Sequence, residues 1–370
     1  MDSKNSKINY SSISIIVPTY QERDNLASLV ERIEAVKDKH NYDLELLIMD
    51  DDSQDGSEEV IRSLEKDWVK LHIRTANRGL SLAVIDGLDR AKKDVLVVMD
   101  ADLSHPPETV PDLIRAIRDG AEFVIGSRYV AGGSTSDDWG VLRWLNSRLA
   151  TLMALPFTTA KDPMSGFFCL TNTTYKSSKS LNPVGYKIGL ELIVKCNITR
   201  VDEVPIHFEQ RKSGESKLTM KEQLRYIQHI RRLFIYKFGT WSHLIQFLTV
   251  GGMGSIVNIA ILTVLLTASV GIELAVALAI FLSMNFNFAL NRRFTFSYAR
   301  RDSIAKQYVG FMATCSIGAV VNYLVTFELL SFAPSMWPQV AAFFGIMAGG
   351  AFNFILNYYG VFRYGRKKQK

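Results

Sequence analysis

Apolar and polar residues follow two different patterns along the chain. In the first 240 residues, short apolar runs alternate with segments in which apolar side chains recur every three or four positions. Beyond them, long stretches contain no Asp, Glu, Lys or Arg: 244–272, 274–291, 307–327 and 329–362. A helix of about 20 mainly apolar residues is long enough to cross a bilayer. We therefore expect an all-α membrane domain over residues 241–370, with four helices near 244–268, 272–292, 307–331 and 338–360.

The first 217 residues have the pattern of an α/β domain. Short apolar runs predict strands at 14–17, 44–49, 71–74, 94–99 and 123–125, and helical spacing predicts helices at 25–37, 57–66, 81–91 and 111–118. Strands that alternate with helices in this order are typical of a doubly wound sheet. Ligands bind such sheets beyond the carboxyl ends of the strands. Pro18, Asp50 and Asp100 all stand at predicted strand ends, so we expect them near a binding site.

Residues 218–240 connect these two parts. Leu224, Ile227, Ile230 and Phe234 are spaced by three and four, and Lys and Arg residues lie between them. This pattern predicts a basic amphipathic helix that lies on the membrane surface. An ordinary core helix of the α/β domain is the alternative interpretation.

The membrane domain contains an internal repeat. The segment FNFALN at 286–291 recurs as FNFILN at 352–357, 66 positions later. Phe247 and Asn258 recur as Phe311 and Asn322, 64 positions later. We therefore expect the four spans to form two repeated hairpins of the same orientation. Hydrogen bonds between helices are one role for asparagine in lipid, and contact with a lipid headgroup is the other.

The distribution of charge indicates an orientation in the membrane. Lys and Arg gather in the connection between the second and third spans and in the C-terminal tail, whereas the connections around 269–272 and 333–339 carry none. Basic segments stay on the cytoplasmic side, so we expect a multi-pass membrane protein whose α/β domain and C-terminus are cytoplasmic. The formal net charge of +6 suits anionic lipid or a phosphorylated ligand.

Two further classes of partner are not expected. Nucleic acid is disfavoured because the basic residues flank the spans and do not form one stripe. Nothing in the sequence indicates an obligate protein partner.

Asp100 and Asp102 come directly after the apolar run 95–99. Two carboxylates this close do not both ionise easily unless a cation lies beside them. Mg²⁺ and Mn²⁺ favour oxygen ligands, and Mg²⁺ is commonly shared with the phosphates of a substrate. The pair therefore predicts a metal that grips a diphosphate. Capping of the following helix by Asp102 or Ser104 is the alternative.

The segment DDDSQDG at 50–56 raises a second possibility, an EF-hand calcium loop. With Gly56 at the sixth position of such a loop, the twelfth is Arg62, where a bidentate glutamate is required. The calcium interpretation therefore fails. A carboxylate at the end of this strand is instead suited to accept hydrogen bonds from a nucleobase or ribose.

Six segments in order resemble one family of enzymes: 17–26 (VPTYQERDNL), 50–53 (DDDS), 100–106 (DADLSHP), 126–129 (GSRY), 162–167 (DPMSGF) and 214–217 (GESK). Together they resemble the dolichol-phosphate mannose synthases, which are family 2 glycosyltransferases with the GT-A fold. The likeness covers about residues 12–235. The four-span tail is similar to the membrane domain of some polyprenyl-phosphate glycosyltransferases. The resemblance implies a GT-A-type mixed sheet.

The resemblance also implies an activity, which is inverting transfer of mannose from GDP-mannose to dolichyl (polyprenyl) phosphate with Mg²⁺ or Mn²⁺. Matching residues bind the guanosine part of the donor at Pro18, Tyr20, Glu22, Ile48 and Asp50. The diphosphate and metal are bound at Asp100, Ala101 and Asp102, and Ser104 lies near the metal, either as a ligand or through water. Basic residues that contact phosphates match Arg128, Arg211 and Lys217, and Arg143 is a further candidate for the acceptor phosphate beside Arg128.

The chemistry of this transfer can be argued independently. An acceptor hydroxyl usually needs a general base, whereas a phosphate monoester, with a second pKa of about 6, is already an anionic nucleophile. The site must therefore bring two polyanions together rather than supply a base. The metal and Arg128, Arg143, Arg211 and Lys217 are expected to offset the repulsion, since arginine suits bidentate phosphate contacts. With Asp102, these four residues form the expected catalytic set.

Two alternatives remain open from the sequence. A polyprenyl-phosphate glucosyltransferase that uses UDP-glucose would keep the mechanism and change the donor. A lipid-linked sugar translocator or membrane scaffold is a different class. Charges within the membrane would support a transport pathway, and only Glu273 and Glu328 qualify, both near the expected ends of spans.

Overall fold

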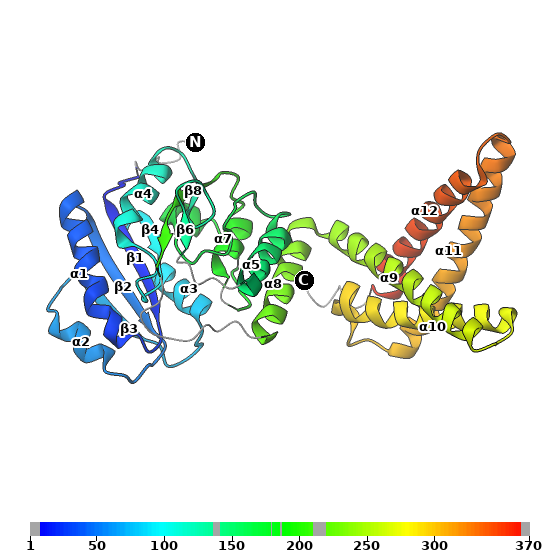
Figure 1. The fold of residues 1–370 in the computed structure, drawn as a ribbon, viewed down its shortest axis with the longest axis horizontal. Helices are drawn as coiled ribbons and strands as arrows, with labels where there is room; N and C mark the ends of the chain where they lie inside the picture. Colours follow the sequence, from blue (N-terminus) through cyan, green and yellow to red (C-terminus); the bar gives the residue numbers. More distant parts are fainter. Residues whose placement is uncertain (1–7, 136–140, 179, 186, 210–219, 364–370) are drawn as a thin grey trace. The chain divides into compact units, whose positions relative to one another are not determined.

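The structure is a computed structural model that describes residues 8–135, 141–178, 180–185, 187–209 and 220–363. It divides into two compact units, Met1–Lys237 and Phe238–Lys370. The first unit is built on a sheet with helices on both of its faces, and the second is helical (Figure 1). Each unit has its own hydrophobic core.

A mixed sheet organises the first unit. Its strands, in spatial order, are β3 (Val69–Ile73), β2 (Asp43–Asp50), β1 (Ser12–Thr19), β4 (Val95–Val98), β7 (Phe168–Thr171), β5 (Phe123–Ser127) and β8 (Val201–Pro205). β7 runs antiparallel to β4 and β5, and the remaining neighbours are parallel. The short strands β6 (Ser134–Thr135) and β9 (His207–Phe208) pair separately. The expected doubly wound mixed sheet is confirmed.

Helices cover both faces of this sheet because its strands are apolar on both sides. One face packs against α1 (Arg23–His40), α2 (Ser57–Ser63) and α4 (Val110–Arg118), with the short turn η1 (Pro107–Thr109) before α4. The other packs against α3 (Leu80–Arg90), α6 (Asn172–Lys176) and α7 (Ile188–Lys195). α3 approaches the sheet closely at Gly87, where a Cβ would lie 2.4 Å from the Ile16 Cγ2 atom.

Two further helices of the first unit, α5 (Val141–Ala154) and α8 (Met220–Phe238), contact each other. The Tyr226 hydroxyl on α8 donates a hydrogen bond to the Ala150 carbonyl on α5, at 2.7 Å. His229 and Leu233 are buried on the same helix, whereas Leu224 and Ile227 are half exposed. α8 thus has one face in the core of the unit and a second, partly apolar face outside it.

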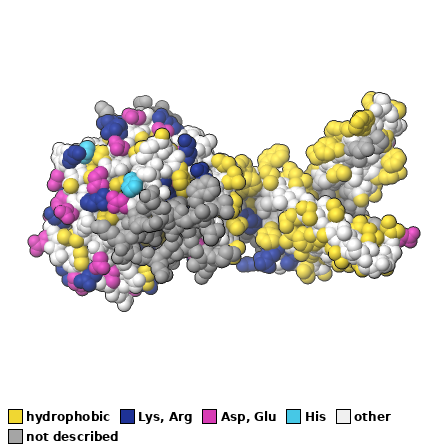
Figure 2. Space-filling model, in the orientation of Figure 1, with side chains coloured by type: hydrophobic (Ala, Val, Ile, Leu, Met, Phe, Trp, Pro, Cys, Tyr) yellow, Lys and Arg dark blue, Asp and Glu magenta, His cyan; other side chains and the backbone are white. Residues whose placement is uncertain are grey.

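The second unit contains α9 (Thr240–Thr267), α10 (Ile272–Leu290), α11 (Ile304–Phe332) and α12 (Pro338–Leu356). Three helical segments within the described residues are long and apolar enough to cross a membrane: Thr240–Thr267, Ile272–Thr295 and Ile304–Phe332. A fourth span, on α12, stays a prediction. Hydrophobic side chains are spread over this unit on the face in view, whereas charged side chains are scattered over the first (Figure 2).

The internal repeat has a structural counterpart. α10 ends in a π-helical turn, η2 (Asn291–Thr295), and α12 ends in another, η4 (Asn357–Val361), 66 positions later. After η2 comes a short 3-10 turn, η3 (Ser297–Ala299). Phe296 and Phe362 follow the two π turns and are fully buried, and their rings stack with centroids 4.4 Å apart. The repeated residues therefore build the centre of the unit's core.

Asparagines of the repeat join neighbouring helices. The Asn258 amide on α9 donates to the Ser283 hydroxyl on α10, at 3.2 Å, and the Asn357 amide donates to the Thr314 hydroxyl on α11, at 2.8 Å. α9 and α10 also approach closely, because a Cβ on Gly254 would lie 2.1 Å from the Asn287 side chain. Asn258 and Asn357 therefore form hydrogen bonds between helices, which is the first of the two roles considered for them.

Candidate active site

A tight loop after β4 carries the paired aspartates. The Asp100 backbone N–H donates to the Nδ1 atom of His105, at 3.0 Å. The His105 ring is buried and stacks on Phe167 with centroids 5.2 Å apart. Burial lowers the pKa of His105, which outweighs the opposing charges of Asp100 and Asp102. A neutral histidine thus acts as the acceptor that fixes the start of the loop.

The second aspartate is held by the residue two positions later. Ser104 donates both its backbone N–H, at 3.1 Å, and its hydroxyl, at 2.5 Å, to the same Oδ1 atom of Asp102. Leu103, between them, has a positive φ of 61°, a strained conformation for a branched residue. The hydroxyl of Ser104 therefore orients the Asp102 carboxylate.

A buried ion pair lies beside this loop. Arg128, just after β5, donates Nε and Nη2 to the two carboxylate oxygens of Asp162, both at 2.8 Å. The Asp162 side chain is almost fully buried, and that of Arg128 is 12% exposed. Burial alone would lower the pKa of Arg128, but the hydrogen bonds and charge of Asp162 raise it above the ordinary value. Arg128 is therefore a fixed, permanently charged cation.

A second cation at this site, the partly buried Lys187, was not predicted from the sequence. Its Nζ donates to the Met164 carbonyl at 3.0 Å, in the same loop that contains Asp162. Burial, followed by the positive charge of Arg128, lowers the pKa of Lys187 to about 8. Lys187 lines a small cavity together with Pro18, Asp100 and other residues. Pro18 and Asp100 were predicted to lie near a binding site at the ends of two different strands, and both line this cavity.

The residues expected at the guanosine end lie at the carboxyl ends of β1 and β2. Asp50 is buried and accepts hydrogen bonds from the Thr19 hydroxyl and from the Ser53 hydroxyl and backbone N–H. Those bonds use three of about four acceptor positions that a carboxylate offers. Tyr20 is 47% exposed, as a stacking surface requires, whereas the Ile48 side chain is fully buried in the core. Any donor contact of Ile48 is thus limited to its backbone.

Glu22 also lies near this edge, immediately before α1. Its carboxylate accepts a hydrogen bond from the Asn25 side chain at 2.7 Å. Ala101, in the aspartate loop, is buried with 2% of its surface exposed. These expected donor-binding residues stay predictions, because the structure contains no donor.

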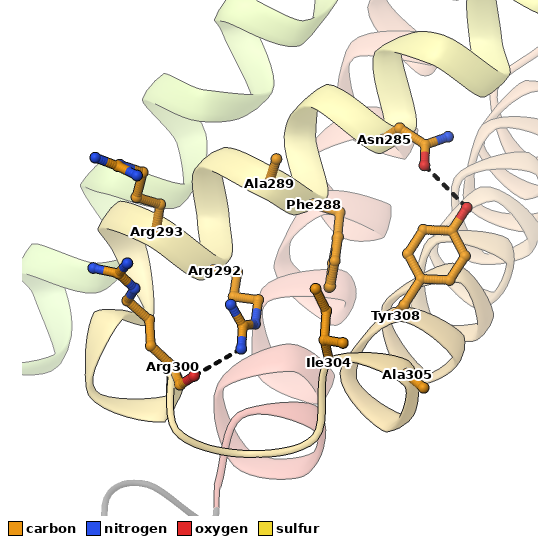
Figure 3. Close-up of a pocket in the computed structure, with 9 residues that line it drawn as sticks. All are labelled: Asn285, Phe288, Ala289, Arg292, Arg293, Arg300, Ile304, Ala305 and Tyr308. Carbon is orange, nitrogen blue, oxygen red and sulfur yellow. Dashed lines mark hydrogen bonds between the residues drawn. The ribbon is translucent and has the colours of Figure 1, made fainter.

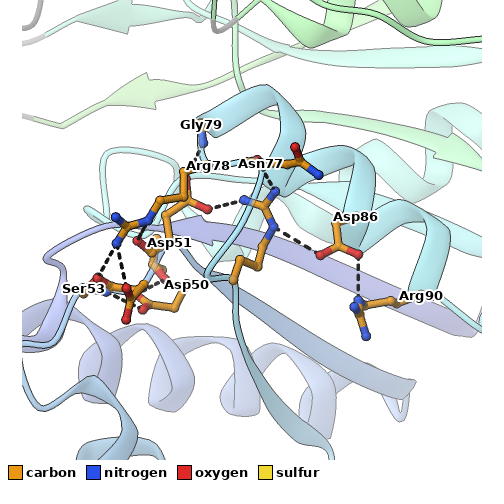
Figure 4. Close-up of polar contacts among 11 residues, drawn as sticks. Asp50, Asp51, Ser53, Asn77, Arg78, Gly79, Asp86 and Arg90 are labelled. Atoms are coloured by element: carbon orange, nitrogen blue, oxygen red, sulfur yellow. Dashed lines mark hydrogen bonds and ion pairs between the residues drawn. The ribbon is translucent and has the colours of Figure 1, made fainter.

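The two aspartates after Asp50 have protein partners. Figure 4 shows Asp51 and Arg78 among these contacts. Asp51 is buried, pairs with Arg74 and accepts the Gly79 backbone N–H at 2.6 Å. Arg78 donates to the backbone carbonyl and side chain of Asp52, at 2.9 and 3.0 Å. These contacts tie the loop before α3 to the end of β2. Arg74 is a structural partner of this loop that was not predicted from the sequence.

Three expected phosphate-binding residues are only partly placed. Arg143 belongs to α5, but its side chain lies outside the described part of the structure. Arg211 and Lys217 lie outside the described residues altogether. Of the four predicted basic residues, Arg128 is the one with a described side chain. Its partner Asp162 belongs to the 162–167 loop, which approaches Asp100 at Gly166.

The donor set of this site is made of oxygen atoms. Within the described residues, no three His, Cys, Asp or Glu side chains are grouped in the manner of a complete metal site. The Asp100 and Asp102 carboxylates are hard ligands of the kind that Mg²⁺ and Mn²⁺ take, and such ions commonly complete their shell with water and phosphate oxygens. The residues present therefore fit a divalent ion that is shared with a diphosphate.

Two family models match the chain. Residues 14–174 match "Glycosyl transferase family 2", and residues 246–362 match "GtrA/DPMS, transmembrane domain". The first match contains β1 to β7, including both the aspartate loop and the Arg128–Asp162 pair. The second contains the helices with the internal repeat. The fold and the site thus define a membrane-attached glycosyltransferase.

Similar proteins make this class more specific. A dolichol-phosphate mannosyltransferase of Pyrococcus furiosus is 42% identical over 323 residues, which are 86% of this chain and 90% of that protein. A dolichol-phosphate mannosyltransferase of Saccharomyces cerevisiae is 42% identical over 246 residues, which are 64% of this chain and 91% of that protein. The chain therefore belongs to the dolichol-phosphate mannosyltransferase family.

Similar solved structures include glucosyl-3-phosphoglycerate synthase from Mycobacterium tuberculosis in complex with Mn²⁺, UDP and phosphoglyceric acid. The sequence identity is 18%, the TM-score is 0.47, and the match covers 62% of this chain and 78% of that one.

Proposed function

We propose that the protein transfers mannose, with inversion, from GDP-mannose to the phosphate of dolichol or another polyprenol, which releases GDP. The family provides the reaction class, and the names of the similar proteins support mannose and a dolichyl phosphate acceptor. The observation that carries the proposal is that the loop with Asp100 and Asp102 lies against the 162–167 loop, whose Asp162 holds the cation Arg128. A Cβ on Gly166 of that loop would lie 3.4 Å from Asp100 Oδ1. Such a site suits a reaction between two phosphorylated substrates.

In this proposal, Asp100 and Asp102 hold the donor diphosphate through Mg²⁺ or Mn²⁺. When bound, the ion would neutralise the diphosphate and stabilise the departing GDP as a Lewis acid. Ser104 is a positioning residue here, because its N–H and hydroxyl both bind Asp102 Oδ1. His105 has a similar role for the backbone of Asp100.

Arg128 faces the developing charge in this reaction. Asp162 fixes both the direction and the charge of its guanidinium through two hydrogen bonds of 2.8 Å. A preorganised cation needs little rearrangement as charge builds on the phosphates. The acceptor is already an anion near neutral pH, so we assign no general base. Arg143, Arg211 and Lys217 remain proposed phosphate contacts on the basis of the sequence motifs.

We propose that this reaction occurs at the cytoplasmic face of the membrane. The basic connection after η2 supports that orientation, as does the exposed apolar side of α8, which includes Leu224 and Ile227. Four spans, with α12 as the last, would place both ends of the second unit on that face. The transport alternative has less support, because Glu273 and Glu328 are both exposed rather than buried among the described helices.

Turnover by the full chain in detergent with added lipid tests the proposal. GDP release is measured from GDP-mannose with and without dolichyl phosphate and Mn²⁺, and UDP release is measured from UDP-glucose in parallel. We expect release only with GDP-mannose, acceptor and metal together. Turnover of UDP-glucose alone would overturn the donor, and absence of turnover with both donors would overturn the proposed function.

Two aspartate variants provide the matched comparison. Asp102→Asn keeps the shape of the side chain and removes its charge, so we expect a fall in turnover of about 100-fold or more. Asp67→Asn makes the same chemical change at an exposed position before β3. It is expected to retain the wild-type rate. Equal rates for the two variants would contradict the role of Asp102.

A further inference from the structure

A groove of about 600 Å³ lies in the second unit, between the end of α10 and the start of α11. Its volume is in the range of sites that hold small ligands. Nine residues line it (Figure 3): Asn285, Phe288, Ala289, Arg292, Arg293, Arg300, Ile304, Ala305 and Tyr308. The groove belongs to one unit and contains none of the residues of the candidate active site.

The lining has an apolar part and a basic part. Phe288, Ala289, Ile304 and Ala305 supply apolar surface, and the Tyr308 hydroxyl is fixed by a hydrogen bond of 3.0 Å to Asn285 Oδ1. In Figure 3, the guanidinium groups of Arg293 and Arg300 point to the same side, away from Tyr308. Such a surface is suited to an amphiphile with a charged head and an apolar tail.

The arginines of the groove have no carboxylate partner among residues 220–363. Arg292 donates to the Gln307 side chain at 2.7 Å and to the Arg300 carbonyl at 2.7 Å, which are neutral acceptors. Arg293 and Arg300 are exposed, and Arg293 lies over the Phe294 ring at 5.9 Å. Among residues 220–363, these three positive charges therefore form no ion pair, which favours an anionic ligand.

The second repeat indicates that the π turn does not require the charges of Arg292 and Arg293. The positions 66 residues after Arg292 and Arg293 are Tyr358 and Tyr359, and the second π turn forms there nevertheless. Tyr358 is buried and its ring lies 5.4 Å from that of Phe354. Residues common to both repeats build the core, whereas Arg292 and Arg293 occur at this place in the first repeat alone. Arg300, in contrast, is matched 66 positions later by Arg366. A role in binding explains the difference.

We propose that this groove binds a polyprenyl phosphate, with its phosphate on Arg293 and Arg300 and the first part of its tail along Phe288 and Ile304. This inference rests on the proposed function for the identity of the lipid. A phosphate monoester is close to a dianion near neutral pH, which matches two exposed guanidinium groups. A diester phospholipid has one negative charge and two tails, so it suits the groove less well. The site would hold acceptor lipid at the second unit, in addition to the acceptor contacts of the head.

Binding stoichiometry tests this second site. Native mass spectrometry of the full chain in neutral detergent measures bound farnesyl phosphate, with farnesol and phosphatidylglycerol as comparison ligands. We expect two farnesyl phosphates on the wild type and one on the Arg293→Gln/Arg300→Gln double variant. Arg301→Gln, a matched change in the same connection but outside the groove, should keep two. Two bound molecules on the double variant would overturn the proposal, as would equal binding of phosphatidylglycerol at the groove.

Kinetics and a head variant separate this proposal from the proposed function. The double variant should raise KM for dolichyl phosphate about tenfold, with kcat unchanged, because charge-assisted contacts to the lipid are lost. Arg128→Gln should leave the groove occupied while it lowers turnover. Binding that depends on Arg293 and Arg300 without any mannosyl transfer would retain the groove and refute the proposed function. An unchanged KM in the double variant would refute the groove as an acceptor site.

Discussion

Two arginines of the first unit and two of the second differ in their burial and in their ion pairs. In the first unit, Arg74 and Arg128 are buried and each pairs with a carboxylate, Asp51 and Asp162. In the second, Arg293 and Arg300 are exposed and have no carboxylate partner within the described residues. A paired cation is held in one direction and can serve as a fixed part of a reaction site. An uncompensated cation at the membrane remains able to bind the charge of a lipid.

The largest effects are expected where a pair is broken. Arg128→Gln should lower kcat/KM by about 100-fold to 1,000-fold, as the loss of a preorganised stabilising group does. Asp162→Asn should also destabilise the head by about 3–5 kcal/mol, because Arg128 stays buried without its counter-charge. Steady-state kinetics and thermal unfolding measure the two effects. Wild-type activity in both variants would contradict the role of the Arg128–Asp162 pair in the reaction. Wild-type stability of Asp162→Asn would contradict its role in compensating the buried charge.

In the second unit, a large loss of stability is expected when a core aromatic side chain is removed. Phe296 is fully buried against Phe362, so Phe296→Ala should cost about 3–5 kcal/mol of stability. Thermal unfolding in detergent measures this loss, with Phe294→Ala as the control because Phe294 is 45% exposed. Equal melting temperatures of the two variants would show that the stacked pair of Phe296 and Phe362 does not stabilise the unit.

Lys187 extends the comparison to a partly buried cation that donates a hydrogen bond to a backbone carbonyl. Its Nζ supports the Met164 carbonyl in the loop beside Asp100. Lys187→Met keeps most of the volume and removes the charge, so we expect kcat/KM to fall about 10-fold to 100-fold, which corresponds to one or two charge-assisted contacts. Lys195→Met, a change of the same kind at the end of α7, provides the control. Equal kinetics in the two variants would assign Lys187 a purely structural role.

The smallest expected effect is a pH dependence of stability that arises from His229, on the buried face of α8. Burial, helped by the nearby charges of Arg232 and Lys195, lowers the pKa of His229 from 6.5 to about 4. Below its unfolded pKa, the unfolded chain binds a proton that the folded chain does not, so stability is lost as the pH falls from about 6.5 towards 4. Relative to pH 7.5, the loss should reach about 2 kcal/mol at pH 5.

His229→Gln isolates this contribution. The neighbouring Glu191 has a pKa raised by burial, which gives the opposite sign of pH dependence. Melting temperatures of the wild type and the variant between pH 7.5 and 5 should therefore diverge, and the variant should lose less stability. Identical slopes would show that His229 is not kept neutral in the folded chain.

Much of the fold was accessible from the sequence because its signals are local. Apolar runs located β1, β2 and β4, and a run of residues without charges located the helices of the second unit. The antiparallel β7 was not predicted, since its four residues have no alternation and their pairing partners lie far away in the chain. The repeat spacing of 66 predicted paired hairpins but not the π turns, which depend on how the ends of the helices pack.

The candidate site was predictable only in part for the same reason. Asp100 and Asp102 stand out beside each other in one loop, whereas Arg128 and Asp162 are 34 positions apart and meet because β5 and β7 are neighbours. Lys187 has no motif around it, and only the fold shows that it lies beside Asp100. Ser104 was expected near the metal, and its hydrogen bonds to Asp102 give it a more specific proposed role, that of a positioning residue.

Metal-dependent binding of GDP tests the central claim most directly, which is that the loop after β4 directs two carboxylates at a metal-bound diphosphate. Calorimetry would measure GDP affinity with and without Mn²⁺ for the wild type, Asp102→Asn and the control Asp67→Asn. We expect Mn²⁺ to strengthen GDP binding in the wild type and in Asp67→Asn, and to have little effect in Asp102→Asn. Equal strengthening by Mn²⁺ in all three proteins would contradict the account.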